Sequence, residues 1–402
     1  MGINKIVYVI CNDVYKNIEI NTLFFSKLVS EIEEVIFIDI GIDRNNTSHS
    51  TINYKGITYD VIRVKSIRSL YVLLSKKCIV ISMFSEKITD WWVYLLIRYC
   101  NVPLIYVNNF GNFINFSFKI RKNISILSSI TSVYKSVTGK LKRVIPDRLF
   151  YLLIVVNIFK SIDVLYISNA SRSHAINIKY RNKHKETVLV NSSFYDTSIV
   201  DNFTITDEYI VFVDGMLPYH GDQINCGYSP IDKCIYFDRL NHIFSYLENK
   251  TNKEIVVCLH PNYDEKTCVE DYRGRKTIKN QTQSYIARAS LVLFHDTTAI
   301  ISAFVYNKKV IQLVGSIFND FQKNLFSQYD KFKINKVDFM SDAELEKVIQ
   351  DDKLSLNRSV IDEFIASNII SSGRRNETGC SQIINDLEFR YGLSRKCMNH
   401  NT

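Results

Sequence analysis

The sequence predicts an α/β protein made of two Rossmann-like halves. At 402 residues the chain is too long for one compact core and fits about two domains. Short apolar runs alternate with stretches of helical spacing, a pattern typical of βαβ units and a parallel sheet. A polar segment at 191–207 interrupts this alternation, which then restarts. We therefore expect one domain over 1–205 and a second, with closing helices at its end, over 206–402.

In the first half, apolar runs predict strands at 5–10, 34–40, 58–64, 78–82, 102–107, 162–167 and 187–190. Helical spacing predicts helices at 18–31, 66–75 and 87–100. The apolar run at the start of the chain is too short for a signal peptide or a spanning segment, so we interpret it as the first strand. Because no apolar stretch reaches about 20 residues, we expect no transmembrane helix.

In the second half, the same patterns predict strands at 208–213, 255–259, 290–294 and 309–313. Helices are predicted at 234–249, 281–289, 298–306, 341–350, 361–370 and 381–391. Ser341 followed three positions later by Glu344 is the pattern of a capping box.

Composition and charge restrict the class of partner. The net charge of +9 favours anionic partners such as phospholipid surfaces and nucleotide phosphates. The cysteines are scattered from Cys11 to Cys397 without a CxxC pair or zinc spacing, so we expect reduced thiols, some of them in the core as at Cys258. Neither half contains GxGxxG or a Walker A sequence, which excludes the NAD and P-loop interpretations.

Residues 118–148 are strongly basic, and a run of apolar residues at 149–159 follows them. Apolar side chains also interleave with the basic ones, and Asp147 is the one acid. Such a segment suits binding at the interface of an anionic membrane; the alternative is a solvated basic face beside a buried helix. We do not expect nucleic acid as a partner, because no recognised binding module accompanies the charge.

Polar residues follow three predicted strands directly. His260 and Pro261 end the strand at 255–259, and Asp214-Gly215 ends the strand at 208–213. His220 and Asp222 come shortly after the second of these. Ligands of parallel sheets bind outside the carboxyl ends of strands, where an imidazole and a carboxylate would be well placed. Taken singly, each motif is also compatible with a simple turn.

The third strand end carries two hydroxyls, Thr297 and Thr298, between the strand at 290–294 and a predicted helix. Hydroxyls beside free backbone N–H groups at a helix start make an anion site, and Asp and Thr are also good N-cap residues. Capping alone would need only one such residue. The three motifs, in this order and each at a strand end, together predict one ligand site.

The run from Asp214-Gly215 through His260-Pro261 to Thr297-Thr298 resembles bacterial sialyltransferase-type enzymes of the GT-B fold. Their marks are an acidic-Gly motif, a His-Pro motif and a Ser/Thr pair. The segment Leu217-Pro218-Tyr219-His220 is also similar to surface-carbohydrate and O-antigen biosynthesis proteins. The resemblance covers about residues 205–315, whereas the first half matches only in architecture.

This resemblance implies transfer of a nonulosonic acid such as sialic acid from its CMP donor to a glycan hydroxyl, without a metal or a cofactor. Asp214 would be the general base, His260 would bind the departing phosphate, and Thr297 with Thr298 would hold it. Gly215 would let the backbone approach the ligand, beside Pro261. Val213 stands where many relatives carry a first acid, which leaves His220 or Asp222 as alternative bases.

Arg275, next to Arg273, could bind the donor carboxylate with a bidentate contact or could lie in a solvated turn. The second domain would bind the CMP-sugar, and the first would face the acceptor and the membrane.

The resemblance implies an enzyme of lipopolysaccharide or capsule synthesis that is cytoplasmic and peripheral on the inner face of the bacterial membrane. Its acceptor would be a lipid-linked glycan. One alternative is a GT-B transferase with another nucleotide sugar, such as CMP-Kdo. Another is a non-catalytic scaffold that binds glycan or lipid in the same pathway.

Overall fold

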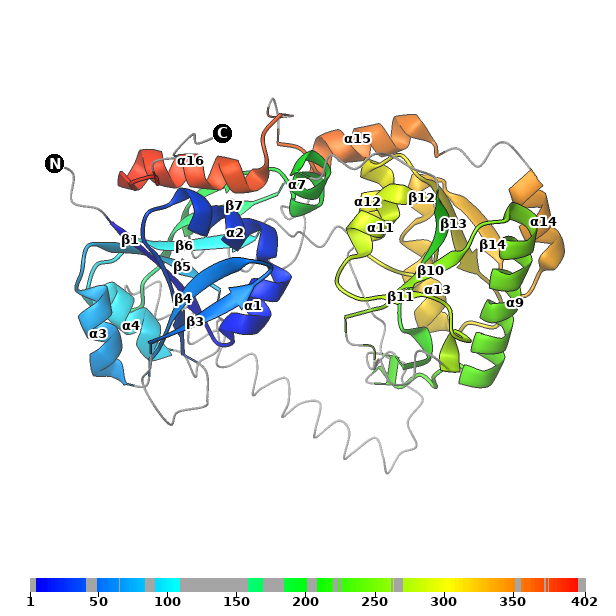
Figure 1. Ribbon diagram of the computed structural model, residues 1–402, viewed down its shortest axis with the longest axis horizontal. Helices are drawn as coiled ribbons and strands as arrows, with labels where there is room; N and C mark the ends of the chain where they lie inside the picture. Colours follow the sequence, from blue (N-terminus) through cyan, green and yellow to red (C-terminus); the bar gives the residue numbers. More distant parts are fainter. Residues whose placement is uncertain are drawn as a thin grey trace. The chain divides into compact units, whose positions relative to one another are not determined.

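The computed structural model describes residues 5–40, 49–64, 66–83, 91–108, 158–168, 184–200, 208–219, 223–224, 226–261, 263, 270–350, 356–371, 374 and 376–396. These residues form two compact units, one of the described residues up to 193 with those from 374 onward, the other of 194–371. Each unit is built on its own mainly parallel sheet (Figure 1). The predicted α/β fold with two Rossmann-like domains is therefore confirmed. The basic segment before residue 158, His220 and Asp222 lie outside the described residues.

The first sheet has eight strands in the order β3-β4-β2-β1-β5-β6-β7-β8. They are β1 (Ile6–Cys11), β2 (Val35–Asp39), β3 (His49–Tyr54), β4 (Ile57–Arg63), β5 (Cys78–Ser82), β6 (Leu104–Asn108), β7 (Ile162–Ile167) and β8 (His184–Leu189). β3 pairs antiparallel with β4 through a turn in which Lys55 and Gly56 both have positive φ, as a two-residue hairpin loop requires. The sequence did not predict β3, because its residues are mostly polar.

Helices cover both faces of this sheet. One core contains residues from α1 (Val14–Ile20), α2 (Thr22–Glu31) and α16 (Gly379–Tyr391), and the other contains residues from α3 (Ile67–Leu74) and α4 (Trp91–Tyr99). In β1, Val7 and Val9 belong to the first core, whereas Tyr8 and Ile10 belong to the second. A central parallel strand is buried on both faces, which is why β1 reads as one continuous apolar run.

The C-terminal helix belongs to the first unit, in contrast to the predicted boundary that placed 206–402 together. On α16, Ile383 and Leu387 lie in the same core as β1. The Asn191 side chain donates to the carbonyl of Arg374 at 2.8 Å and to that of Glu377 at 2.7 Å. A side chain at Gly379 would collide with the Asn191 carbonyl. The chain after residue 371 is thereby tied to the segment that follows β8.

The second sheet is fully parallel across its described strands, in the order β11-β10-β9-β12-β13-β14. These are β9 (Tyr209–Val213), β10 (Ile255–Cys258), β11 (Thr277–Ile278), β12 (Ala289–Phe294), β13 (Lys309–Val314) and β14 (Asn335–Asp338). The short strands β11 and β14 were not predicted. β9 and β12 lie side by side at the centre, although the chain visits β10 and β11 between them.

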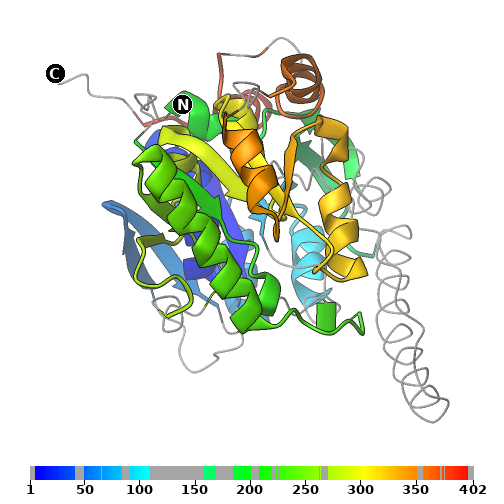
Figure 2. The same ribbon diagram turned by 90° about the vertical axis from the view of Figure 1, so that its right-hand side faces the viewer.

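The helices of this unit are α7 (Ser193–Val200), α9 (Lys233–Thr251), α11 (Thr282–Arg288), α12 (Ile300–Val305), α13 (Asp320–Ser327), α14 (Asp342–Gln350) and α15 (Arg358–Asn368), with 3₁₀ turns at Leu217–Tyr219 and Asp330–Phe332. Residues of α9, α13 and α14 form one core with the sheet, and α9 lies along that face (Figure 2). α11 and α12 lie on the other side of the sheet (Figure 1). α7 occupies part of the segment predicted as a polar boundary, and α13 was not predicted.

The capping box predicted before α14 forms only in part. The Ser341 hydroxyl accepts from the amide of Glu344 at 3.2 Å, as expected of an N-cap. The Glu344 carboxylate, however, accepts from the amide of Asp338 at 2.7 Å. It ties the helix to the end of β14.

Candidate functional site

The ends of the three central strands of the second unit lie together. The Asp214 amide donates to the Cys258 carbonyl at 3.0 Å, which joins the end of β9 to the end of β10. A Cβ atom built on Gly215 would lie 2.6 Å from the Asp296 carbonyl oxygen, so the end of β9 also touches the loop after β12. Strand order reverses between β9 and β12, and this is where ligands bind in open α/β sheets.

Asp214 lies under this edge with 3% of its surface exposed. Its Oδ1 accepts from the Met216 amide at 2.8 Å, in a tight turn where Met216 has a φ of 56°. Its Oδ2 has no hydrogen-bond partner of ordinary geometry within the described residues. The Tyr272 hydroxyl is also without one, so the two groups are near each other but not well aligned.

Burial raises the pKa of the Asp214 carboxyl to about 7. The Met216 amide, the Tyr272 hydroxyl and the His260 amide act in the opposite direction on this pKa, whereas the charge of Asp271 adds to its rise. A carboxyl that titrates near neutral pH can take up and release a proton under ordinary conditions. Because the His260 amide acts on the pKa of Asp214, the His260 segment lies close to this carboxyl.

Asp271 joins the loops that follow β9 and β10. It is buried, and its Oδ2 accepts from the Tyr219 hydroxyl at 3.0 Å and from the Tyr263 hydroxyl at 2.5 Å. Tyr219 lies in the turn after β9, and Tyr263 lies three residues beyond His260. Burial, together with the Asp271 carboxylate, raises the pKa of Tyr219 to about 12. The Asp271 carboxylate is thus a shared acceptor that fixes both loops, a role that sequence reasoning missed.

We predict that Asp271→Asn loosens this edge and shifts the titration of Asp214. Loss of charge-assisted bonds to the buried Tyr263 hydroxyl and the half-buried Tyr219 hydroxyl should lower the free energy of unfolding by about 1–3 kcal/mol. Because the Asp271 charge raises the pKa of Asp214, that pKa should also fall. Urea unfolding and an NMR titration of Asp214 measure the two effects. Asp238→Asn, which removes an exposed partner of Arg273, serves as control and should change neither quantity. Wild-type values for Asp271→Asn would contradict this role.

The loop after β12 is held by Tyr329. Its hydroxyl donates to Asp296 Oδ1 at 2.7 Å and accepts from the Thr297 amide at 2.9 Å. Thr297 Oγ1 accepts from the Ala299 amide at 3.2 Å. Simple capping by Asp or Thr was the alternative to an anion site at this loop, and α12 itself has Ala299 as its N-cap without a side-chain bond. The Thr297 amide is engaged by the Tyr329 hydroxyl, so this N–H group is not available to an anion, and the two threonine hydroxyls stay the predicted anion contacts.

The two histidines near these strand ends have different surroundings. His260 is half-buried directly after β10, and its carbonyl accepts from the Tyr263 amide at 2.9 Å. His295 is fully buried and surrounded by aromatic rings, and one ring nitrogen, Nδ1, bonds the Leu313 carbonyl at 2.7 Å. Burial lowers the pKa of His295 to about 4. His295 therefore stays neutral as a core residue.

The structure does not bring Arg275 into this group. Arg275 precedes β11 and therefore lies at the amino end of the sheet, whereas Asp214 and His260 lie at the carboxyl end. Its guanidinium bonds both carboxylate oxygens of Glu248, at 3.0 and 2.8 Å, and Asn241 Oδ1 at 2.7 Å. Of the two alternatives for Arg275, a contact with the donor carboxylate or a solvated turn, the structure shows neither, and the side chain instead binds α9. Pro261, by contrast, is exposed beside His260.

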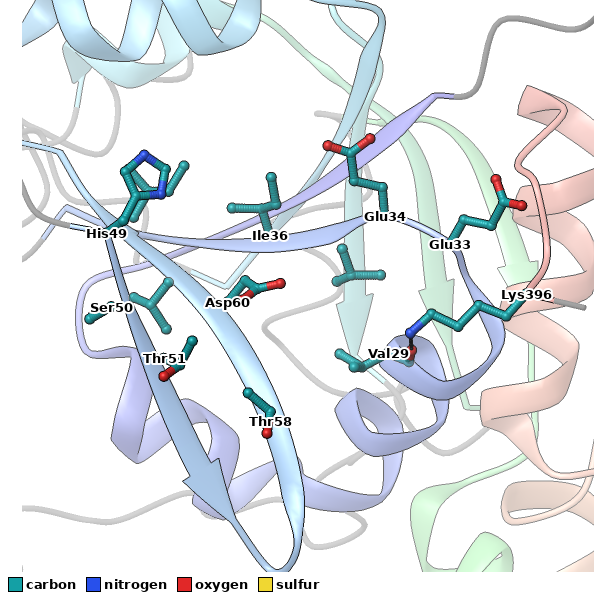
Figure 3. A pocket seen from close by; sticks show the side chains of 13 residues that line it. Val29, Glu33, Glu34, Ile36, His49, Ser50, Thr51, Thr58, Asp60 and Lys396 are labelled. Carbon is teal, nitrogen blue, oxygen red and sulfur yellow. Dashed lines mark hydrogen bonds between the residues drawn. The ribbon is translucent and has the colours of Figure 1, made fainter. Parts of the chain in front are cut away.

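A separate hollow of about 620 Å³ lies in the first unit (Figure 3). Residues of β2, β3 and β4 line it, with Glu33, Glu34 and Lys396 at one side. The Lys396 ammonium donates to the Val29 carbonyl at 2.7 Å. This hollow flanks one margin of the first sheet, away from the reversal of strand order between β1 and β5. We therefore assign no chemistry to it.

The described residues have two further properties. They contain no group of three or more His, Cys, Asp or Glu residues placed to hold a metal ion. No helix among them has both the length and the apolar character needed to cross a bilayer.

Comparisons with known proteins give only distant likenesses. No family model and no curated protein matches the sequence. Among solved structures, the chain is similar to a UDP-N-acetylglucosamine 2-epimerase, with 13% identity, 97% of both chains covered and a TM-score of 0.49. It is also similar to the wall teichoic acid polymerase TagF, with 12% identity over 95% of this chain and 88% of that one and a TM-score of 0.49. MnaA of S. aureus, in a co-structure with UDP, has 14% identity over 97% and 98% of the chains and a TM-score of 0.46. Likenesses this distant carry no argument about activity.

Proposed function

We propose that the protein is a glycosyltransferase that moves sialic acid or a related nonulosonic acid from its CMP donor to a glycan hydroxyl. The observation that carries this proposal is the meeting of the three strand ends in the second unit. They bring the acidic-Gly, His-Pro and Thr-Thr motifs of the sequence resemblance to one edge of one sheet. A single small ligand could then contact all three motifs.

In the proposed reaction, the acceptor hydroxyl attacks the anomeric carbon of the donor. The bond from that carbon to the phosphate oxygen breaks, and CMP leaves with the bonding electrons. The His260 imidazole would donate a hydrogen bond to the departing phosphate, whose charge grows in the transition state. The hydroxyls of Thr297 and Thr298, both half-buried at this edge, would donate to the same phosphate.

Asp214 would take the proton of the acceptor hydroxyl on Oδ2. That oxygen lacks a hydrogen-bond partner of ordinary geometry, and the pKa near 7 suits a general base at neutral pH. Since Asp214 is buried, the acceptor must enter beneath the loops that follow β9 and β10. His220 and Asp222 are the alternative bases from the sequence, and both lie outside the described residues.

The proposal extends to a setting. The acceptor would be a lipid-linked glycan of O-antigen or capsule synthesis at the inner face of the cytoplasmic membrane. The net charge of +9 supports a partner with an anionic surface.

Two assays test this function, first nucleotide binding and then transfer of the sugar. A thermal-shift series with CMP, CDP, UDP and GDP should show stabilisation by CMP, because a ligand that binds only the native state raises its melting temperature. Transfer from CMP-sialic acid should fall by about 10²-fold or more in His260→Ala. His242→Ala, which removes an exposed histidine of α9, should keep full activity. Stabilisation by UDP or GDP but not CMP would point to another donor, and full activity of His260→Ala would refute the proposed role of this site.

A further inference from the structure

The outer side of α3 and α4 exposes large apolar side chains. Tyr99 is 77% exposed, Ile67 58%, Val72 55% and Tyr71 41%. The rings of Tyr71 and Tyr99 lie with their centroids 5.9 Å apart, so the exposed side chains of α3 and α4 meet at this pair. Figure 1 shows α3 and α4 next to each other on the outside of the first sheet. Single exposed apolar residues are ordinary in proteins, but a grouped patch of this kind marks an interaction surface.

The sequence of α3 explains the patch. Leu70 and Leu74, one turn apart, are buried against the sheet. Ile67 and Tyr71 share a second face, again with a spacing of four residues. A helix that only covers a sheet usually carries polar residues on its solvent side. Here apolar residues continue around to that side, and packing against the described residues of the unit does not account for them.

Charges at the patch have one sign. Neither α3 nor α4 contains an acidic residue. Arg68, Lys76 and Lys77 are exposed on α3 and in the turn after it, without an ion-pair partner in the described part of the chain. The acids Glu33 and Glu34 precede β2 at the same end of the sheet as Lys77, on the other side of β1, and neither is on α3 or α4.

We propose that the α3–α4 patch (Ile67, Tyr71, Val72 and Tyr99 with Arg68, Lys76 and Lys77) binds the surface of an anionic lipid bilayer. Aliphatic and tyrosine side chains would enter the boundary between headgroups and acyl chains, while the cations meet the lipid phosphates. The basic segment 118–148 of the same chain is a poorer occupant, since it carries the same sign of charge. The patch would supply the membrane contact of the proposed function, on which this inference rests. Vesicle binding measures that contact without the sugar donor.

Vesicle co-sedimentation of the full chain tests the patch. Wild-type protein should bind vesicles with phosphatidylglycerol more than vesicles of phosphatidylcholine alone, and added salt should weaken the binding. The variant Ile67→Ser/Tyr71→Ser/Tyr99→Ser and the variant Arg68→Glu/Lys76→Glu/Lys77→Glu should each reduce the bound fraction about fivefold or more. Because every substituted side chain is exposed, thermal melts should confirm that both variants remain folded.

Matched substitutions elsewhere serve as controls. Ile235→Ser/Phe389→Ser removes two other exposed apolar residues, and Lys309→Glu/Lys323→Glu/Lys347→Glu reverses three other exposed charges. Both control variants should bind as wild type does. Wild-type binding by the patch variants, or no preference of the wild type for anionic vesicles, would overturn the inference. Stabilisation by CMP should be unchanged in the patch variants, so that loss of vesicle binding and failure of the proposed donor remain distinguishable.

Discussion

Asp214→Asn is expected to abolish transfer and at the same time to stabilise the protein at alkaline pH. Burial raises the pKa of this carboxyl to about 7, above the ordinary value of 3.8 that it regains on unfolding. The folded state therefore favours the protonated form, and wild-type stability is lost as pH rises from about 4 through 7. At pH 8 the ionised carboxylate costs on the order of 4 kcal/mol, which the neutral amide avoids. At pH 4 most of this difference should disappear.

Urea unfolding of wild type and Asp214→Asn between pH 4 and pH 8 measures this effect, and transfer assays at pH 7 measure the loss of activity. Asp362→Asn, at an exposed ion pair on α15, is the control, and its free energy of unfolding should not rise relative to wild type as the pH increases. Equal stability of Asp214→Asn and wild type at pH 8 would mean that the pKa of the Asp214 carboxyl is not raised in the folded protein. Retained activity would transfer the role of base to His220 or Asp222.

Gly215→Ala is expected to separate the ends of β9 and β12. The added Cβ would lie 2.6 Å from the Asp296 carbonyl, and a backbone atom cannot move away as a flexible side chain can. We expect a loss of about 1–3 kcal/mol in the free energy of unfolding. Displacement of the Asp296–Thr297 loop should also reduce transfer about 10²-fold, because misplacement of binding groups by 1 Å has effects of that order.

Gly56→Ala is a matched control for this substitution. It lies in the hairpin turn of the first unit with a φ of 78°, and its Cβ would meet nothing within 4 Å. Its cost should be about 1 kcal/mol from the left-handed backbone alone, and transfer should be unaffected. Unfolding and activity assays on both variants make the comparison. Wild-type activity in Gly215→Ala would show that contact between these strand ends is not needed.

The sequence predicted the strands that build this edge because β9 and β10 are short apolar runs and β12 is apolar except for Ser290. Since parallel strands share one direction, residues directly after them had to lie at the same edge, which placed Asp214 and His260. The hydrogen bond between Asp271 and Tyr219 could not be predicted from the sequence, because it joins residues 52 positions apart. No local pattern distinguishes such a buried carboxylate from an acid in a surface turn.

Other differences have the same kind of origin. The amphipathic pattern of α16 shows that one face is apolar, but it does not say which sheet that face covers. Arg275 looked available for a ligand because its partner Glu248 lies 27 residues away on α9. His295 is the first of the polar residues that follow β12, which suggests a loop position. Its ring nevertheless lies in the aromatic core of the second unit. In each case tertiary packing determines the role.

A crystal structure with CMP is the most direct test that the strand ends of the second unit form one nucleotide site. We predict that the phosphate lies within hydrogen-bond distance of the His260 imidazole and of the Thr297 or Thr298 hydroxyl. Asp214 Oδ2 should then face the position that the sugar of the donor would occupy. CMP bound elsewhere, or a phosphate out of reach of both His260 and the two threonines, would contradict the proposed site.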